Sequence, residues 1–381
     1  MQSVFIWNIK IHPTSILRIC CFSMLLCVVA STVHGQQRRR PNTTSPEVAE
    51  NGNVTFRIQA AKAESVELQG QWSKDTLPLI KNDDGVWEIT VNSIPAGVWE
   101  YRFRVDDLSM IDPGNTSIKP MRSPRTSILH IPGKPPLAHD FQDVPHGTIH
   151  LHIYHSKSLN RLRELAVYTP PNYNAKLDAR FPTLYLQHGS GDNHATWTVH
   201  GKAHWIADNL IAAKKAKPMV IVMMDGHASP PGAARERRNE FFEKDLLNDV
   251  MPFVHSNYRL ATDAEQRAIV GLSMGGGQSL TIGLNHTDKF SWIGGFSSAA
   301  PQDQVTLNAF ADSAKTNDRL NLLWIACGKD DFLLKRNEDF IERLKQANIQ
   351  HEWILTEGDH SWPIWRKYLA DFLPRLFQTN E

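Results

Sequence analysis

A serine between paired glycines follows a short apolar run in the second half of the chain. Residues 268–270 read Ala-Ile-Val, the motif Gly-Leu-Ser-Met-Gly occupies 271–275, and a helix-like segment covers 276–284. A strand, a tight turn and a helix with serine at the apex form a nucleophile elbow, whose glycines are needed because a Cβ would collide with neighbouring elements. Because the helix begins at the serine, we expect the Met274 N–H to point toward the oxyanion that forms when Ser273 attacks a carbonyl.

A nucleophilic serine needs a histidine base and a carboxylate, which follow it in the order acid, histidine when the elbow belongs to an α/β-hydrolase. A buried-strand pattern ends just before Asp330 and Asp331, and the next strand pattern is followed by Asp359 and His360. We predict that His360 takes the proton of Ser273 and returns it to the leaving alcohol, while a carboxylate fixes the imidazole tautomer. Position alone leaves Asp330, Asp331 and Asp359 open as that acid.

A second oxyanion donor is expected on a glycine-rich turn upstream. The strand-like segment 181–187 ends in His188-Gly189-Ser190-Gly191. A His-Gly turn after the third strand of an α/β-hydrolase supplies an N–H to the oxyanion. The residues leave Ser190 and Gly191 both open as the donor.

From about residue 147 to 376, the chain resembles the feruloyl and acetyl xylan esterases of carbohydrate esterase family one. That family shares its α/β-hydrolase fold with enterochelin esterases and mycolyl transferases. The matching stretches are 167–173, 187–189, 242–247, 271–276, 328–331 and 358–362. The resemblance implies that the acid is Asp331, three residues after the strand-ending Gly328. It also implies hydrolysis of carboxylic esters on plant-cell-wall polysaccharide through an acyl-enzyme intermediate.

Two loops are expected to open onto the active-site face, because ligands gather at the carboxyl ends of parallel strands. They follow the strands that end at 187 and 224. We predict that His188, Trp197 and Trp362 contact substrate, the tryptophans as walls for an aromatic acyl group or a sugar, with local packing as their alternative role. Serine chemistry needs no metal, and we expect neither a metal nor a cofactor.

Composition limits the partners that the chain can have. Its 381 residues are 41% hydrophobic, which suits a globular protein of two domains. Lys plus Arg number 41 and Asp plus Glu number 40, so the net charge is +1. This balance gives no electrostatic reason to expect a polyanion, and nucleic acid is not an expected partner.

The first 35 residues have the pattern of a secretory signal peptide. Lys10 and Arg18 precede the apolar run 19–33. The prediction is a secreted or periplasmic protein with no membrane attachment after cleavage, and an uncleaved anchor is the alternative. The mature chain would keep only Cys327, so no internal disulfide is expected and Cys327 is assigned to the core.

Residues 36–47 read as a polar linker, and residues 48–132 as short alternating strands separated by turn residues. This segment resembles the early-set immunoglobulin-like module of starch and glycogen branching enzymes, on the strength of 70–72 and 99–103. The sequence therefore predicts a small all-β immunoglobulin-like sandwich followed by an α/β-hydrolase domain at 137–381, with a proline-rich boundary at 132–136.

Three tryptophans of the predicted sandwich, Trp72, Trp87 and Trp99, could stack on sugar rings or could belong to the core. Trp87 and Trp99 alternate with other apolar residues on one strand face each, which favours the core. We accordingly expect the module to brace or shape the catalytic cleft rather than capture polysaccharide by itself.

Other functions remain open at this point. The same triad could transfer the acyl group to an alcohol, as mycolyl transferases do, or hydrolyse a siderophore, as enterochelin esterases do. A non-catalytic polysaccharide-binding protein is a third possibility. The acyl group, the sugar and the oligomeric state do not follow from the sequence.

Overall fold

The computed structural model describes residues 42–173, 178–230, 232, 234 and 237–378. The expected signal peptide at 1–35 and the first half of the expected linker, 36–41, lie outside the described residues. Asn42–Glu381 group into one unit by their internal contacts, and this unit contains two β-structured modules.

The N-terminal module is a sandwich of two antiparallel sheets. One sheet has the order β1-β2-β6-β5; the other has the order β4-β3-β7-β8, with β9 also paired to β7. The strands are β1 (Glu47–Val48), β2 (Val54–Gln59), β3 (Val66–Gly70), β4 (Thr76–Pro78), β5 (Ile80–Lys81), β6 (Val86–Val91), β7 (Gly97–Val105), β8 (Leu108–Met110) and β9 (Ser127–Ile131).

The tryptophans of this module pack with its core. Trp87 is buried among the core residues, and Trp72 and Trp99 are half-buried against them. The Trp72 ring stacks on Phe56 with centroids 5.7 Å apart, and the Trp99 Nε1–H donates to the Pro95 carbonyl at 2.7 Å. The alternation therefore predicted the core positions of Trp87 and Trp99 correctly, whereas the packing of Trp72 on the core did not follow from it.

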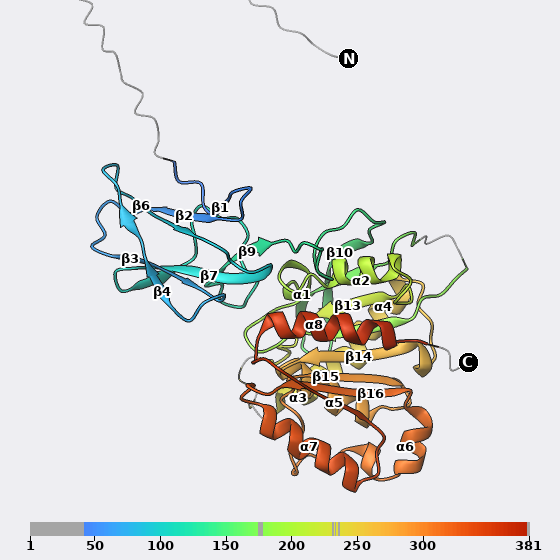
Figure 1. Cartoon of the computed structure of the whole chain (residues 1–381). Helices are drawn as coiled ribbons and strands as arrows, with labels where there is room; N and C mark the ends of the chain where they lie inside the picture. Colours follow the sequence, from blue (N-terminus) through green and yellow to red (C-terminus); the bar gives the residue numbers. More distant parts are fainter. Residues whose placement is uncertain (1–41, 174–177, 231, 233, 235–236, 379–381) are drawn as a thin grey trace, which may run out of the picture. The chain divides into compact units, whose positions relative to one another are not determined.

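The C-terminal module is built on an eight-stranded sheet in the order β10-β11-β13-β12-β14-β15-β16-β17 (Figure 1). The pairs β10/β11 and β11/β13 are antiparallel, and all later neighbours are parallel. The strands are β10 (Thr148–Ser156), β11 (Arg161–Thr169), β12 (Thr183–Gln187), β13 (Val220–Met224), β14 (Arg267–Leu272), β15 (Trp292–Phe296), β16 (Leu322–Gly328) and β17 (Glu352–Thr356). Central strands such as β12 and β13 are buried at every position, which explains why they read as unbroken apolar runs.

Helices cover both faces of this sheet, and each face has its own apolar core. On β11, Val167 belongs to one core and its neighbour Tyr168 to the other, as the period of two requires. Helices α1 (Thr196–Val199), α2 (Ala203–Ala212) and α8 (Trp362–Phe372) share a core with one face. The opposite core contains residues of α3 (Arg238–Asp245), α4 (Met251–Asn257), α5 (Met274–Asn285) and α7 (Leu334–Gln346).

The remaining helical segments are short. They are the π-helical stretch Leu246–Val250, helix α6 (Ser313–Arg319) and 3₁₀ turns at Ala264–Gln266, Asn308–Phe310 and Leu373–Arg375. Within the described part of the chain, no helix has the length and apolarity needed to cross a bilayer. A mainly parallel sheet between helices, preceded by a β-sandwich, confirms the predicted fold class.

Candidate active site

Ser273 stands at the turn between β14 and α5. Its φ of 53° and ψ of −117° are strained for a residue with a side chain. The glycines on either side permit this turn: a Cβ on Gly271 would lie 2.5 Å from the Gly275 backbone, and one on Gly275 would overlap the carbonyl oxygen of His188. The local sequence thus folds into the sharp turn that the motif predicts.

The structure brings Ser273, His360 and Asp331 together from three different strand ends. The His360 Nε2 lies 3.0 Å from the Ser273 Oγ. On the other side of the ring, Nδ1 lies 2.9 Å from both carboxylate oxygens of Asp331. A proton on Nδ1 shared with the carboxylate leaves Nε2 free to accept the serine proton.

The carboxylate is the buried member of the group, with a side chain that is 0% exposed. Burial by itself would raise the pKa of Asp331, but hydrogen bonds from His360 and from the Leu333 N–H outweigh it, and the pKa is lowered. Asp330 and Asp359 are exposed, and Asp359 accepts the hydroxyl of Ser361. Among the three acids that the sequence left open, only Asp331 contacts His360.

The two N–H groups suited to an oxyanion belong to Met274 and Ser190. Met274 is the first residue of α5, so its N–H has no intrahelical acceptor. Ser190 shares one cavity with Ser273 and Met274, and its N–H donates to no described residue. The Gly191 N–H is already used, because it donates to the His227 Nε2 at 3.2 Å. The geometry therefore favours Ser190 and removes Gly191 from the two donors left open by the sequence.

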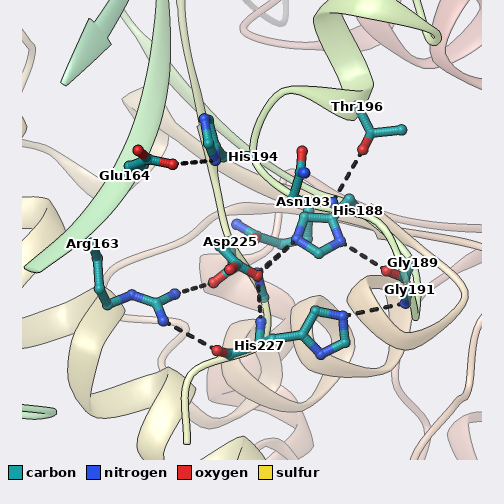
Figure 2. A network of polar contacts seen from close by, with 12 residues as sticks. Arg163, Glu164, His188, Gly189, Gly191, Asn193, His194, Thr196, Asp225 and His227 are labelled. Atoms are coloured by element: carbon teal, nitrogen blue, oxygen red, sulfur yellow. Dashed lines mark hydrogen bonds and ion pairs between the residues drawn. The ribbon is translucent and has the colours of Figure 1, made fainter. Parts of the chain in front are cut away.

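His188 does not line the cavity, contrary to the predicted substrate contact. Its side chain is 1% exposed. Its Nδ1 lies 2.8 Å from the Gly189 carbonyl (Figure 2). Its Nε2 accepts from the Gly226 N–H at 2.8 Å. His188 fixes the turn after β12 to the turn after β13, which explains why a polar residue is buried there.

A network around Asp225 and His227 holds the same turns in place (Figure 2). The His227 N–H donates to the Asp225 carboxylate at 2.9 Å, and the Arg163 guanidinium donates to the carbonyls of both residues. Burial is the largest influence on His227 and lowers its pKa to about 4. A neutral imidazole keeps the Nε2 lone pair that accepts the Gly191 N–H.

Trp197 and Trp362 lie in the core rather than in a cavity wall. They are 1% and 2% exposed. Their rings meet edge to face with centroids 4.9 Å apart, and the Trp197 Nε1–H donates to the Gln187 carbonyl at 2.9 Å. The predicted role as walls for substrate is wrong for both, and local packing accounts for them.

A cavity of about 610 Å³ opens beside Ser273. Its aromatic wall is Phe332, which is 76% exposed and lies 4.3 Å from the His360 ring, centroid to centroid. Four arginines also line it, namely Arg122, Arg161, Arg238 and Arg336. None of these five residues was predicted from the sequence. Phe332 could have been found from its position directly after the acid Asp331. The arginines come from separate segments that share no motif.

The sandwich contacts the turn that carries Ser190. Met121 pairs with Asp192 in a β-bridge, and the Arg122 N–H donates to the Gly191 carbonyl at 2.9 Å. The Lys119 Nζ lies 3.4 Å from an Asp192 carboxylate oxygen and 2.9 Å from Glu100. These contacts support the expectation that the module braces the cleft.

Metal ligands do not gather anywhere in the described ranges: no group of three or more His, Cys, Asp or Glu side chains could hold an ion there. Cys327 is buried in β16, and burial raises the pKa of its thiol to about 12. A thiol of this kind acts as a small apolar core residue.

Comparison with known families divides the chain into the same two modules. Residues 156–376 match the family described as "Putative esterase". Residues 43–121 match carbohydrate-binding module 48, the isoamylase N-terminal domain.

Two curated relatives carry related activities. An endo-1,4-beta-xylanase/feruloyl esterase of Xylanibacter ruminicola is 30% identical over 89% of this chain and 47% of its own length, so the chain spans about half of that protein. An acetyl esterase of Caldicellulosiruptor saccharolyticus is 27% identical over 52% of this chain and 84% of its own length.

Solved structures share the fold. A ferulic acid esterase of Anaeromyces mucronatus in complex with ferulic acid matches 65% of this chain and 96% of its own, with a TM-score of 0.56 and 24% identity. An enterobactin esterase of Shigella flexneri matches 86% of this chain and 93% of its own, with a TM-score of 0.61 and 17% identity. The chain is related to feruloyl and acetyl esterases and carries an N-terminal carbohydrate-binding module of type 48. Because the match to the esterase family covers more than half of this chain, the chain belongs to that family.

Proposed function

We propose that this protein is a secreted or periplasmic serine esterase that hydrolyses carboxylic esters on plant-cell-wall polysaccharide, of the feruloyl or acetyl xylan type. The observation that carries the proposal is the continuous contact from the Ser273 Oγ through the His360 imidazole to the buried Asp331 carboxylate. This contact lies at the edge of a cavity large enough for a substituted sugar or an aromatic acid.

The reaction follows from the positions of these groups. His360 removes the proton of Ser273 as its oxygen attacks the ester carbonyl, and the N–H groups of Met274 and Ser190 stabilise the oxyanion. The protonated imidazole, held by Asp331, then gives its proton to the leaving alcohol, which leaves the acyl group on Ser273. Water activated by His360 attacks the acyl-enzyme, and the acid is released as the serine regains its proton.

Polysaccharide is favoured as the substrate by three features of different origin. The sandwich matches a carbohydrate-binding module, the curated relatives are a xylanase/feruloyl esterase and an acetyl esterase, and the exposed ring of Phe332 offers the cavity a face for an aromatic acyl group or a sugar. Export to the medium or the periplasm would place the protein where such polymers are found.

A panel of methyl ferulate, acetylated xylan and p-nitrophenyl esters tests the proposal directly. We expect release of ferulate or acetate by the parent protein and none by Ser273→Ala. Hydrolysis of p-nitrophenyl esters without release from either plant-derived ester would contradict the substrate class but not the chemistry.

Two further measurements separate the alternatives. Adding a sugar acceptor distinguishes hydrolysis from acyl transfer, because a transferase would form the new ester in place of the free acid. Pull-down on insoluble xylan with Ser273→Ala, compared with ester turnover by the parent, distinguishes an enzyme from a binding protein. Binding without any turnover by the parent would overturn the enzymatic proposal.

A further inference from the structure

The cavity beside Ser273 has an unbalanced charge. Four arginines line it, and none of its lining residues in the described part of the chain is Asp or Glu. The whole chain has a net charge of only +1. The accumulation of positive charge at this cavity is therefore a local feature and not a consequence of a basic protein.

Two of the arginines are anchored without being neutralised. Arg161 donates to the His227 carbonyl at 3.2 Å, and Arg336 donates to the Ala300 carbonyl at 2.6 Å. A carbonyl fixes the direction of a guanidinium but leaves its charge uncompensated. Both side chains are thus held at the cavity with charge available for a ligand.

Like Arg238, Arg122 is exposed and makes no side-chain hydrogen bond or ion pair with any described residue. Its backbone is nevertheless fixed, because its N–H donates to the Gly191 carbonyl one residue from Ser190. The sandwich therefore contributes Arg122 to the cavity that the expected oxyanion donor Ser190 also lines.

A second cavity, of about 490 Å³, shares Arg122, Arg161 and His227 with the first. Its carboxylates, Asp225 and Glu164, line only this second cavity. Asp225 accepts the His227 N–H and Glu164 lies 3.7 Å from His194, so both have partners of their own. Arg122 and Arg161 are thus the two arginines that line both cavities, and neither forms an ion pair with Asp225 or Glu164.

We propose that this pair binds a carboxylate of the substrate close to the ester that is cleaved, so that the enzyme prefers acidic esters. Guanidinium groups bind carboxylates through paired N–H donors, and such charge-assisted bonds are among the stronger ones in proteins. The inference rests on the proposed esterase function and adds a substrate class to it. The carboxylate belongs either to an acidic sugar on the alcohol side or to a second acid group on the acyl side.

Matched esters test the preference and distinguish these two sources. For an acid on the sugar side, an acetylated methyl glucuronoside is compared with the neutral acetylated methyl glucoside. For an acid on the acyl side, mono-p-nitrophenyl succinate is compared with the neutral p-nitrophenyl butyrate. We expect the acidic member of at least one pair to have the higher kcat/KM, by about 10- to 100-fold, the range of one hydrogen bond to a charged group. This advantage should shrink as salt is added, because the charges are exposed to solvent.

Variants locate the effect. Arg122→Gln and Arg161→Gln should each lower kcat/KM for the acidic ester about tenfold relative to kcat/KM for the neutral ester, and Arg122→Lys should retain part of the preference. Arg125→Gln is the matched control, since Arg125 is exposed on the same segment but absent from both cavities. Equal turnover of acidic and neutral esters, or equal behaviour of Arg122→Gln and Arg125→Gln, would overturn the carboxylate site while leaving the esterase function intact.

Binding provides a readout that does not depend on turnover. Calorimetry with Ser273→Ala compares a xylo-oligosaccharide bearing glucuronic acid with the unsubstituted oligosaccharide, and mono-methyl succinate with methyl butyrate. We expect tighter binding of one acidic ligand, and loss of that difference when Arg122→Gln is added. If no ester is hydrolysed, the proposed function fails, and an absence of preferential acid binding in this experiment would then reject the carboxylate site separately.

Discussion

The imidazole of His227 accepts a hydrogen bond from the N–H of Gly191 at 3.2 Å. This contact uses the donor that could have competed with Ser190 for the oxyanion. It also ties the turn after β12 to the turn after β13, so the position of one expected oxyanion donor depends on a histidine that takes no part in proton transfer.

Ser190→Pro should lower kcat about 10²- to 10³-fold, because it removes one N–H from the oxyanion hole. Ser190→Ala keeps that N–H and should retain most of the activity. Steady-state kinetics on a p-nitrophenyl ester measures both, and the melting temperature shows whether the proline variant is folded. Loss of activity in Ser190→Ala alone would show that the hydroxyl, and not the N–H, is the working group.

Ser273→Ala should lower turnover by about 10⁴- to 10⁶-fold with the fold intact, since the members of a triad act as a unit. A fluorophosphonate probe should label the parent at Ser273 and leave the variant unlabelled. Circular dichroism verifies the fold. Residual activity within about tenfold of the parent would disprove the nucleophile.

Asp331→Asn should lower kcat by about 10⁴-fold, because the amide leaves the imidazole in the wrong tautomer. Asp330→Asn and Asp359→Asn are matched controls on exposed carboxylates and should keep most of the activity. Kinetics on one ester compares the three variants. Normal turnover by Asp331→Asn together with a large loss in either control would show that the acid has been misassigned.

The stability of the fold should fall as the pH decreases from 6.5 toward 4. Burial lowers the pKa of His200 to about 3, and those of His139, His204 and His227 to about 4, from an ordinary value of 6.5. As the pH falls, these histidines are protonated in the unfolded chain before they are protonated in the fold, which favours unfolding below pH 6.5. Once the pH is below their pKa values in the fold, a further decrease adds little more destabilisation.

Denaturant unfolding at a series of pH values tests this dependence. The unfolding free energy should depend less steeply on pH in His200→Gln, because the variant takes up one proton fewer on unfolding in this range. His155→Gln, at an exposed position, serves as the control. A slope that is unchanged by His200→Gln would show that this imidazole is not held neutral in the fold.

Trp197→Ala should lower the free energy of unfolding by about 3–5 kcal/mol, as expected for a large ring removed from a core. The folded fraction should keep its KM, because the ring faces Trp362 and not the cavity. Phe332→Ala is the opposite case and should raise KM with little effect on stability. A KM change in Trp197→Ala without loss of stability would restore the role first assigned to Trp197.

The triad could be predicted because each member is marked by its own strand and loop. Ser273 lies in a sharp glycine-rich turn, and Asp331 and His360 follow runs that are typical of strands and that the structure pairs in one parallel sheet. Parallel strands end on one edge, so order along the chain becomes closeness in space. Choosing Asp331 over Asp330 still required the family resemblance, because side-chain direction in a loop has no periodic signal.

The cavity could not be predicted in the same way. Arg122, Arg161, Arg238 and Arg336 meet through tertiary structure alone, from the sandwich, from β11, from α3 and from α7. Trp197 was misassigned because a tryptophan in a loop beside the active site gives no sign of the direction of its ring. Periodicity identified Trp87 and Trp99 of the sandwich as core residues, because strand alternation provides that sign.

The buried guanidinium of Arg366 in α8 donates to the His200 carbonyl at 3.0 Å and to the Val98 carbonyl of the sandwich at 2.5 Å. A chain begun at residue 137, the boundary expected from the sequence, would keep the whole triad but lose Val98, Lys119 and Arg122. Such a chain would also lose the contacts of Lys119, Met121 and Arg122 that hold the turn carrying Ser190. The smallest part of this chain that is active on its own is therefore expected to include the sandwich. The proline-rich segment 132–136 separates two modules in the sequence, but the two could not be inherited or engineered separately.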